Sequence, residues 1–351
     1  MNKIFQWTLI TVTLFVFSCN RAEPNTNYNL VFEKHIGNKV YEGFIDGAQS
    51  ITSDYSNFLY VNDSGQAHVK QYDLDGNFIR NIGKKGQGPG EFPSPLIVTD
   101  ASDSLLAVND ISGFRISLFD TSGTFISSFP TQKWHSSPSY IVDTTLISRY
   151  GGTNYERNLK GEYQFSKFNF GGERISRFVP YPISEETSDF PARGFISRDD
   201  VSNGLLHLAY LYIPLYQIYD IESEKLLYEF NLSDFPGFEI AYEQESINGD
   251  HPQIIRKIMG ELTQVLAYLH VVDNNIFIMR MPTKKIIIEH FKLEKDTLNH
   301  VDTYAVSPKS LDGDRVLDFI YIPRKDRFYF MQNHIEEGFV VSVFRHEEQL
   351  K

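Results

Sequence analysis

The chain has 351 residues and a formal net charge of −12, and it contains a single cysteine. Binding to nucleic acid requires a basic face that neutralises phosphates, so this charge balance argues against nucleic-acid partners. One cysteine cannot build a disulfide framework, whereas a chain of this length can bury a sizeable core.

Residues 1–18 are typical of a secretory signal peptide. Lys3 precedes a short apolar stretch, and Ser18 places a small residue before Cys19. The apolar stretch is shorter than the ~20 residues that a membrane-spanning helix needs. The run VFSC, which ends at Cys19, resembles a lipobox, in which the signal peptidase cuts before the cysteine and the thiol receives a lipid. An ordinary signal peptide with an incidental cysteine is the alternative.

Residues 19–27 are polar and show no apolar period, which indicates a tether between the lipid and a folded domain. Acyl chains on Cys19 would hold the protein at a membrane surface without spanning it. We therefore expect a protein that is anchored in the bacterial cell envelope through lipid at Cys19.

Residues 28–351 contain a repeat. Residues 59–82 and 106–129 align with a constant offset. In each segment, residues alternate as they do along a strand, and an Asp-x-x-Gly turn leads into another strand, which is typical of hairpins. The same pattern returns, with weaker similarity, at residues 164–178, 215–230, 286–301 and 340–348. The alignment matches Asp63 with Asp110, Asp73 with Asp120, and Gly76 with Gly123.

Six strand-rich units of similar length predict an all-β fold, a six-bladed β-propeller with four-stranded blades. A series of β-sandwiches is the alternative, but it would not give one near-constant period. The last unit ends after a third strand at residues 339–345, whereas residues 28–36 form a spare strand before the first unit. We expect residues 28–36 to complete the last blade and close the ring, because closure removes an open sheet edge.

One interval between units is longer than the others and carries a helical pattern. Asp250 can cap a helix whose first turn contains Pro252, and apolar residues then recur at helical spacing. We expect a helical insertion at about residues 236–264, which either packs over the propeller rim or acts as a lid.

The connector between the first two units contains the run GQGPGEF, at residues 86–92. Three glycines could cradle a phosphate before a helix, but a strand follows here, so backbone geometry is the better interpretation. The connector resembles that of NHL-type propellers, and in particular that of six-bladed propeller lipoproteins of Bacteroidetes. This resemblance implies the fold and an envelope location, but no activity. Surface lipoproteins of this group usually carry several acidic residues after the cysteine, whereas this chain has Glu23 alone, which favours the periplasmic side of the outer membrane.

Candidate ligand-binding residues lie where the second strand of each unit ends. In a propeller, these ends and the connections between blades emerge on one face, so they would surround one mouth of the central channel. That mouth would combine both charges with aromatic rings, as ligand pockets commonly do. For the two aspartates, capping of turn amides is the alternative role. The predicted ligand-binding residues are Asp63, Asp110, Trp134, Tyr150, Tyr210, Arg280 and Asn333.

The motifs offer no catalytic centre. The ten histidines are scattered, neither HExxH nor G-x-S-x-G occurs, and the lipid would occupy the thiol of Cys19. We expect no cofactor, metal or catalytic residue, and we interpret the chain as a non-catalytic propeller that binds or scaffolds a glycan, a peptide or an envelope protein. A calcium- or zinc-dependent propeller hydrolase, lyase or lactonase is the alternative.

Overall fold

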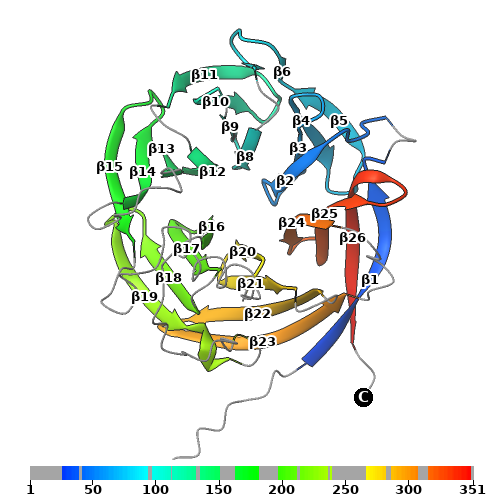
Figure 1. Ribbon diagram of the computed structural model, residues 1–351, viewed down its shortest axis with the longest axis vertical. Helices are drawn as coiled ribbons and strands as arrows, with labels where there is room; N and C mark the ends of the chain where they lie inside the picture. Colours follow the sequence, from blue (N-terminus) through cyan, green and yellow to red (C-terminus); the bar gives the residue numbers. More distant parts are fainter. Residues whose placement is uncertain are drawn as a thin grey trace, which may run out of the picture.

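A computed structural model shows six β-sheet blades arranged in a ring around a central axis (Figure 1). The predicted all-β propeller is confirmed. One short 3-10 helix, η2 (Leu232–Asp234), is the only helical segment in the described stretches. The structure describes residues 26–38, 42–93, 97–111, 113–131, 135–150, 163–181, 197–211, 214–235, 238, 266–281, 286–306 and 315–348.

Each of the first four blades is an antiparallel sheet of four consecutive strands, the first of which lies nearest the axis. Blade 1 contains β2 (Ala48–Ser53), β3 (Phe58–Asp63), β4 (His68–Asp73) and β5 (Phe78–Ile82). Blade 2 contains β8 (Ile97–Ala101), β9 (Leu105–Asp110), β10 (Arg115–Asp120) and β11 (Phe125–Pro130). Blade 3 contains β12 (His135–Val142), β13 (Thr145–Tyr150), β14 (Tyr163–Asn169) and β15 (Arg174–Pro180). Blade 4 contains β16 (Ser197–Ser202), β17 (Leu205–Tyr210), β18 (Leu215–Asp220) and β19 (Lys225–Asn231).

Blades 5 and 6 are joined into one eight-stranded sheet. Blade 5 contains β20 (Tyr268–Val272), β21 (Asn275–Arg280), β22 (Ile286–Glu294) and β23 (Thr297–Val306). Blade 6 contains β24 (Arg315–Ile322), β25 (Arg327–His334) and β26 (Gly338–Glu348), and its fourth strand is β1 (Thr26–Ile36).

The predicted closure by the N-terminal strand is confirmed. β1 pairs antiparallel with β26, in a register that runs from Tyr28 opposite Glu348 to Ile36 opposite Val341. The start of β1 also pairs in parallel with the end of β23, which the sequence did not predict. The repeat indicates that blade 6 lacks a strand, but it carries no information about the free outer edge of blade 5. In Figure 1, β1 accordingly lies between β26 and β23 at the outer rim.

The hydrophobic core consists of six clusters, each of which lies between two neighbouring blades. Successive residues of a strand point to opposite faces of its sheet, so they enter different clusters. Leu59 and Val61 pack toward blade 6, whereas Tyr60, between them, packs toward blade 2. Both faces of each sheet are therefore buried, which explains why the second strands of blades 1 and 2 contain runs of consecutive apolar residues, FLYV and LLAV, rather than an alternating pattern.

The repeated Asp-x-x-Gly turns are stabilised by their aspartates. The Oδ1 atom of Asp73 accepts the backbone N–H groups of Asp75 at 2.9 Å and Asn77 at 2.8 Å. Gly76 adopts a φ of +84°, which glycine tolerates best. Just beyond the corresponding turn, blades 1 to 4 each have a β-bulge whose extra residue is an exposed aliphatic side chain. These residues are Ile79, Ile126, Ile175 and Leu227.

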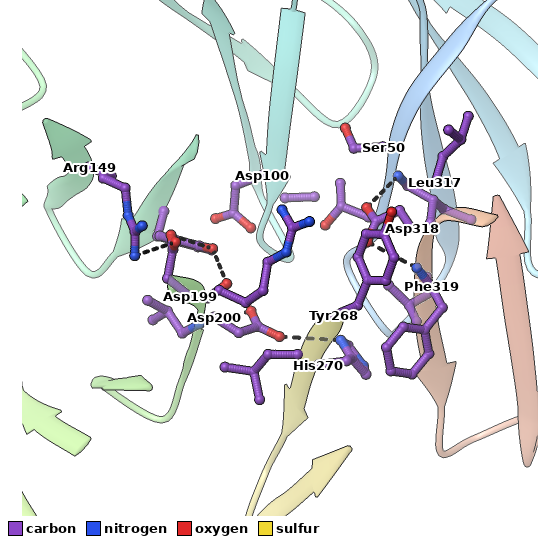
Figure 2. Close-up of a pocket in the computed structure, with 18 of the residues that line it drawn as sticks. Ser50, Asp100, Arg149, Asp199, Asp200, Tyr268, His270, Leu317, Asp318 and Phe319 are labelled. Atoms are coloured by element: carbon purple, nitrogen blue, oxygen red, sulfur yellow. Dashed lines mark hydrogen bonds and ion pairs between the residues drawn. The ribbon is translucent and has the colours of Figure 1, made fainter. Parts of the chain in front are cut away.

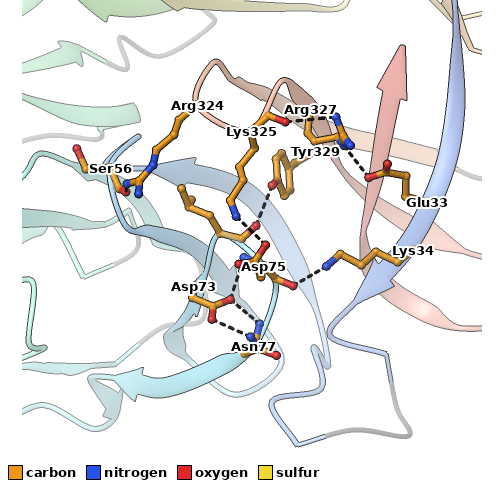
Figure 3. A network of polar contacts seen from close by, with 11 residues as sticks. Glu33, Lys34, Ser56, Asp73, Asp75, Asn77, Arg324, Lys325, Arg327 and Tyr329 are labelled. Carbon is orange, nitrogen blue, oxygen red and sulfur yellow. Dashed lines mark hydrogen bonds and ion pairs between the residues drawn. The ribbon is translucent and has the colours of Figure 1, made fainter. Parts of the chain in front are cut away.

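Polar contacts surround the junction where the two ends of the chain meet (Figure 3). Lys325 pairs with Asp75 at 2.7 Å, and Arg327 pairs with Glu33 of β1, also at 2.7 Å. The Lys34 ammonium donates to the backbone carbonyl of Asp75 at 2.6 Å. The two contacts with Asp75 connect blade 6 and its closing strand to blade 1, and the Arg327 pair connects β1 to the rest of blade 6.

The GQGPGEF connector forms a small loop whose ends pair in parallel as β6 (Lys84–Lys85) and β7 (Glu91–Phe92). Gly90 has a φ of +72°, a backbone conformation in which a side chain would be strained. This geometry supports a structural role for Gly90.

Two predicted segments lie mainly outside the described residues. These are the signal peptide with its tether, apart from residues 26 and 27, and the helical insertion at about residues 236–264, apart from Phe238. No helix within the described stretches is long and apolar enough to span a membrane.

Candidate functional site

A cavity of about 470 Å³ lies on the axis of the ring, between the innermost strands of the six blades (Figure 2). Its volume falls within the range of small-molecule sites, roughly 300–1,000 Å³. Charged and aromatic side chains line much of it, including Tyr55, Asp100, Arg198, Asp200, Tyr268 and Asp318.

Three aspartates connect the blades around this cavity. Asp100, Asp200 and Asp318 stand on the inner strands β8, β16 and β24, so every second blade supplies one. Each carboxylate accepts a backbone N–H from the inner strand of the next blade, and each also accepts the N–H of the residue that follows it. The donors in the next blades are the N–H groups of Ile141 at 2.8 Å, Val271 at 2.7 Å and Ile51 at 3.1 Å.

Burial favours the neutral form of two of these carboxyl groups. Burial raises the pKa of Asp100 to about 7 and that of Asp318 to about 6, although the backbone N–H donors act in the opposite direction. Within the described residues, neither side chain forms an ion pair. Near neutral pH the cavity therefore holds carboxyl groups that are poised to lose or gain a proton.

Blade 4 departs from the pattern of blades 2 and 6. The two positions before the repeated aspartate hold Arg198 and Asp199, where blade 2 has Val98 and Thr99 and blade 6 has Val316 and Leu317. The Arg198 guanidinium lies over the Tyr268 ring, 4.8 Å from its centroid, and Nε donates to the carbonyl of Ala267 at 2.8 Å. Blade 4 thus adds a pair of opposite charges to the cavity wall.

The carboxylate of Asp199 is paired with side chains of blade 3. The Arg149 guanidinium contacts its carboxylate at 2.9 Å, and the Tyr140 hydroxyl donates to the same carboxylate at 3.1 Å. Arg149 also donates to the backbone carbonyl of Ser197 at 3.0 Å. Figure 2 shows this group on the opposite side of the cavity from Asp318.

His270 is buried beside Asp200. Its Nδ1 atom lies 3.2 Å from the Asp200 carboxylate, and its Nε2 atom lies 3.2 Å from the backbone carbonyl of Tyr321. Both ring nitrogens therefore face oxygen atoms. Within the described residues, no three His, Cys, Asp or Glu side chains gather as a metal site.

Tyr55 enters the cavity from the turn between β2 and β3. Its φ of +58° is unusual for a non-glycine residue, and the turn is held by Asp54, whose Oδ1 accepts the N–H groups of Ser56 at 3.1 Å and Phe58 at 2.8 Å. The Tyr55 ring stacks on His270 at 5.9 Å. Burial, reinforced by the negative charge of Asp200, raises the pKa of the Tyr55 hydroxyl well above its usual value, so the hydroxyl keeps its proton. This hydroxyl has no hydrogen-bond partner among the described residues.

The lining of this cavity does not include the predicted ligand-binding residues that the structure describes. Both aspartates are fully buried: Asp63 accepts the N–H groups of Gly47 at 3.1 Å and Gly65 at 3.0 Å, and Asp110 accepts that of Gly113 at 2.7 Å. For both residues this geometry supports the alternative role in turn capping.

The other predicted residues that the structure describes stand on the second strands of blades 3 to 6. Tyr210 is fully buried between blades 3 and 4, where its hydroxyl contacts Gln164 at 2.9 Å. Arg280 pairs with Glu289, and its guanidinium lies 5.0 Å from the centroid of the Phe238 ring. Asn333 is exposed on β25. Tyr150 ends β13, and Trp134 lies outside the described residues.

The cavity residues were missed because the strand-end pattern directs attention to the second strand of each blade. The available signal was a carboxylate inside a predicted inner strand, in the runs VTDA, RDDV and VLDF. Burying a charged side chain in such a strand costs free energy unless the charge is paired or hydrogen-bonded. Because the aspartate recurs only in alternate blades, a comparison of neighbouring units does not reveal it.

Comparisons with known proteins agree with the six-bladed propeller fold. Residues 45–311 match the family DUF5128, described as a 6-bladed beta-propeller. The chain is similar to the structure of a protein of Bacteroides fragilis that is described as exported, with 13% identity and a TM-score of 0.57 over 92% of this chain and 99% of the other. It is also similar to a member of the DUF4221 family from Bacteroides vulgatus, with 11% identity and a TM-score of 0.59 over 93% of this chain and 100% of the other. These identities show a shared fold alone. No curated protein matches the chain.

Proposed function

The chain belongs to the DUF5128 family of 6-bladed β-propellers, and from the cavity on the axis of this ring we propose that it is a non-catalytic binding protein for a small polar ligand. The observation that carries the proposal is the set of convergent polar groups in the cavity, where Asp100, Asp200 and Asp318 face the same space as Arg198. Pockets that bind small ligands combine an apolar wall with a few convergent polar groups in the same way. The cavity volume, about 470 Å³, suits a short segment of a glycan or peptide.

A ligand that occupies the cavity should stabilise the ring. At a concentration of 100 times Kd, a ligand adds about 2.7 kcal/mol to the free energy of unfolding, which raises Tm by several degrees. The test is differential scanning fluorimetry of the full chain with a panel of mono- to trisaccharides and di- and tripeptides. Thr52→Trp, which places an indole in the cavity, should abolish the shift, whereas Ser128→Trp on the exposed edge of β11 should retain it. A shift that persists in a cooperatively melting Thr52→Trp protein would place the ligand elsewhere.

The proposed location is the bacterial envelope, with the protein held by lipid at Cys19 and on the periplasmic side of the outer membrane. The signal-like residues 1–18 and the VFSC run support this location. A fold shared with a Bacteroides fragilis protein that is described as exported is compatible with it.

The anchor gives a separate prediction. Replacing Cys19 by serine removes the thiol that would carry the lipid, so labelling with radioactive palmitate should fall to background and the protein should leave the membrane fraction or remain unprocessed. Ser18→Ala, which keeps a small residue before the cysteine, is the matched control and should be labelled like the parent protein. A Cys19→Ser protein of mature length that still sediments with membranes would refute lipid anchoring at this residue.

A further inference from the structure

We infer that the ligand of the axial cavity is an uncharged, hydroxyl-rich molecule, namely a saccharide segment. This inference rests on the proposed binding function and specifies the ligand class for the same site. The evidence is the combination of oriented acceptors, unused donors and aromatic rings around one cavity.

The acceptors are held in fixed orientations. Each of the carboxylates of Asp100, Asp200 and Asp318 accepts two backbone N–H groups, one from its own strand and one from the next blade. A carboxylate offers about four acceptor positions, so roughly half of this capacity remains for a ligand on Asp100 and Asp318, and less on Asp200, whose carboxylate also lies 3.2 Å from Nδ1 of His270. Because backbone donors fix the carboxylates before a ligand arrives, little side-chain freedom is lost on binding.

The donors stand in the same cavity. A guanidinium carries five N–H donors, and within the described residues Arg198 uses only its Nε–H, toward Ala267. The Tyr55 hydroxyl adds another donor that has no partner among the described residues. A ligand hydroxyl both donates and accepts, so closely spaced hydroxyls can satisfy carboxylates and guanidinium together.

A charged ligand fits this wall poorly. A cation that approaches the carboxylates also meets Arg198, and an anion that approaches Arg198 also meets Asp200 and Asp318. Either charge would be taken out of water and left with an imperfect partner, which is costly. A neutral polar ligand avoids this cost.

The aspartates also argue against a peptide. An extended peptide commonly binds by adding a strand to an open sheet edge, where it pairs with free main-chain groups. The inner strands β2, β12 and β20 present such edges to the cavity, but the N–H groups of Ile51, Ile141 and Val271 are already bonded to the aspartates. The rings of Tyr55 and Tyr268 instead offer apolar faces for the C–H surface of a sugar.

The test is isothermal titration calorimetry of the full chain with trisaccharides of different charge and with trialanine. The neutral probes are maltotriose, cellotriose and N-acetylchitotriose, the cationic probe is chitosan trimer and the anionic probe is trigalacturonate. We expect at least one neutral trisaccharide to bind. Arg198→Met should weaken that binding at least ~10-fold, as loss of hydrogen bonds from a charged group implies. Tyr55→Phe, which retains the ring and its stacking, should weaken it about 3- to 10-fold.

Matched controls lie on the outer part of blade 3. Arg174→Met and Tyr163→Phe change exposed side chains and should leave the affinity unchanged. The inference is overturned if no neutral trisaccharide binds, or if one binds with the same affinity to the Arg198→Met and Tyr55→Phe proteins. If only a charged trisaccharide or trialanine binds, and Arg198→Met weakens that binding, the saccharide inference is wrong while the proposed function of the cavity stands.

Discussion

Deletion of residues 26–36 is expected to prevent the ring from folding cooperatively, which is the largest effect that we predict. β1 supplies the fourth strand of blade 6 and pairs with β23 of blade 5, so its loss exposes two sheet edges. It also removes Leu30 and Ile36, which are buried in two different clusters between blades. Urea denaturation of the shortened chain, monitored by circular dichroism, should show a broad transition or none, whereas the complete chain should show a single cooperative transition.

A point substitution in β1 tests the packing of its buried face without removing the strand. Leu30→Ala should lower the free energy of unfolding by about 2–5 kcal/mol, because it leaves a cavity in the cluster between blades 5 and 6. Asn27→Ala, on an exposed position of the same strand, should change it by less than about 0.5 kcal/mol. Equal effects of the two substitutions would contradict the role assigned to the buried face of β1.

The ion pairs at the closure should contribute far less than the strand. Lys325 and Asp75 have side-chain exposures of 32% and 67%, and Arg327 and Glu33 have exposures of 30% and 27%. Pairs as accessible as these typically stabilise a protein by about 0–1 kcal/mol. Burial and backbone pairing therefore account for most of the energy that closes the ring.

The ring could be predicted from the sequence because its determinants are local and repeated. Asp73, Gly76 and their counterparts Asp120 and Gly123 mark one turn in each of the first two units, and the strand pattern returns with weaker similarity in the others. The missing fourth strand of the last unit leaves residues 28–36 as its partner. The parallel pairing of β1 with β23 could not be predicted in this way. It depends on where the outer edge of blade 5 lies in space, and strand alternation carries no information about that position.

The candidate site was less accessible to sequence reasoning, for a related reason. Asp63 and Asp110 stand out because they repeat in neighbouring units, but in blades 1 and 2 this repetition marks a shared structural feature, a capped turn. Asp100, Asp200 and Asp318 repeat only in alternate blades, and Arg198 occurs at its position in blade 4 alone. Features that break the blade symmetry are better candidates for function, although only the closed ring shows which of them face the axis.

The second large effect concerns pH. Burial raises the pKa of Asp100 to about 7, whereas in the unfolded chain it titrates near 3.9. Between these values the folded protein retains a proton that the unfolded chain has released, so the free energy of unfolding falls as the pH rises from about 4 to about 7. Each unit of pKa difference corresponds to about 1.4 kcal/mol, so this carboxyl group should account for a decrease of about 2–4 kcal/mol, which levels off about one pH unit above the folded-state pKa.

Asp100→Asn should flatten this dependence, because asparagine does not titrate, and urea denaturation at pH 4.5, 6 and 8 measures the difference. The variant also loses one acceptor for a backbone N–H, a cost that is independent of pH and leaves the slope as the diagnostic quantity. Asp120→Asn is the matched control, since hydrogen bonds from Ser122 and Thr124 lower the pKa of Asp120, and its contribution is lost only as the pH falls. If Asp100→Asn and the parent protein lose stability in parallel between pH 4.5 and 8, the carboxyl group of Asp100 is ionised throughout that range and does not hold its proton in the folded ring.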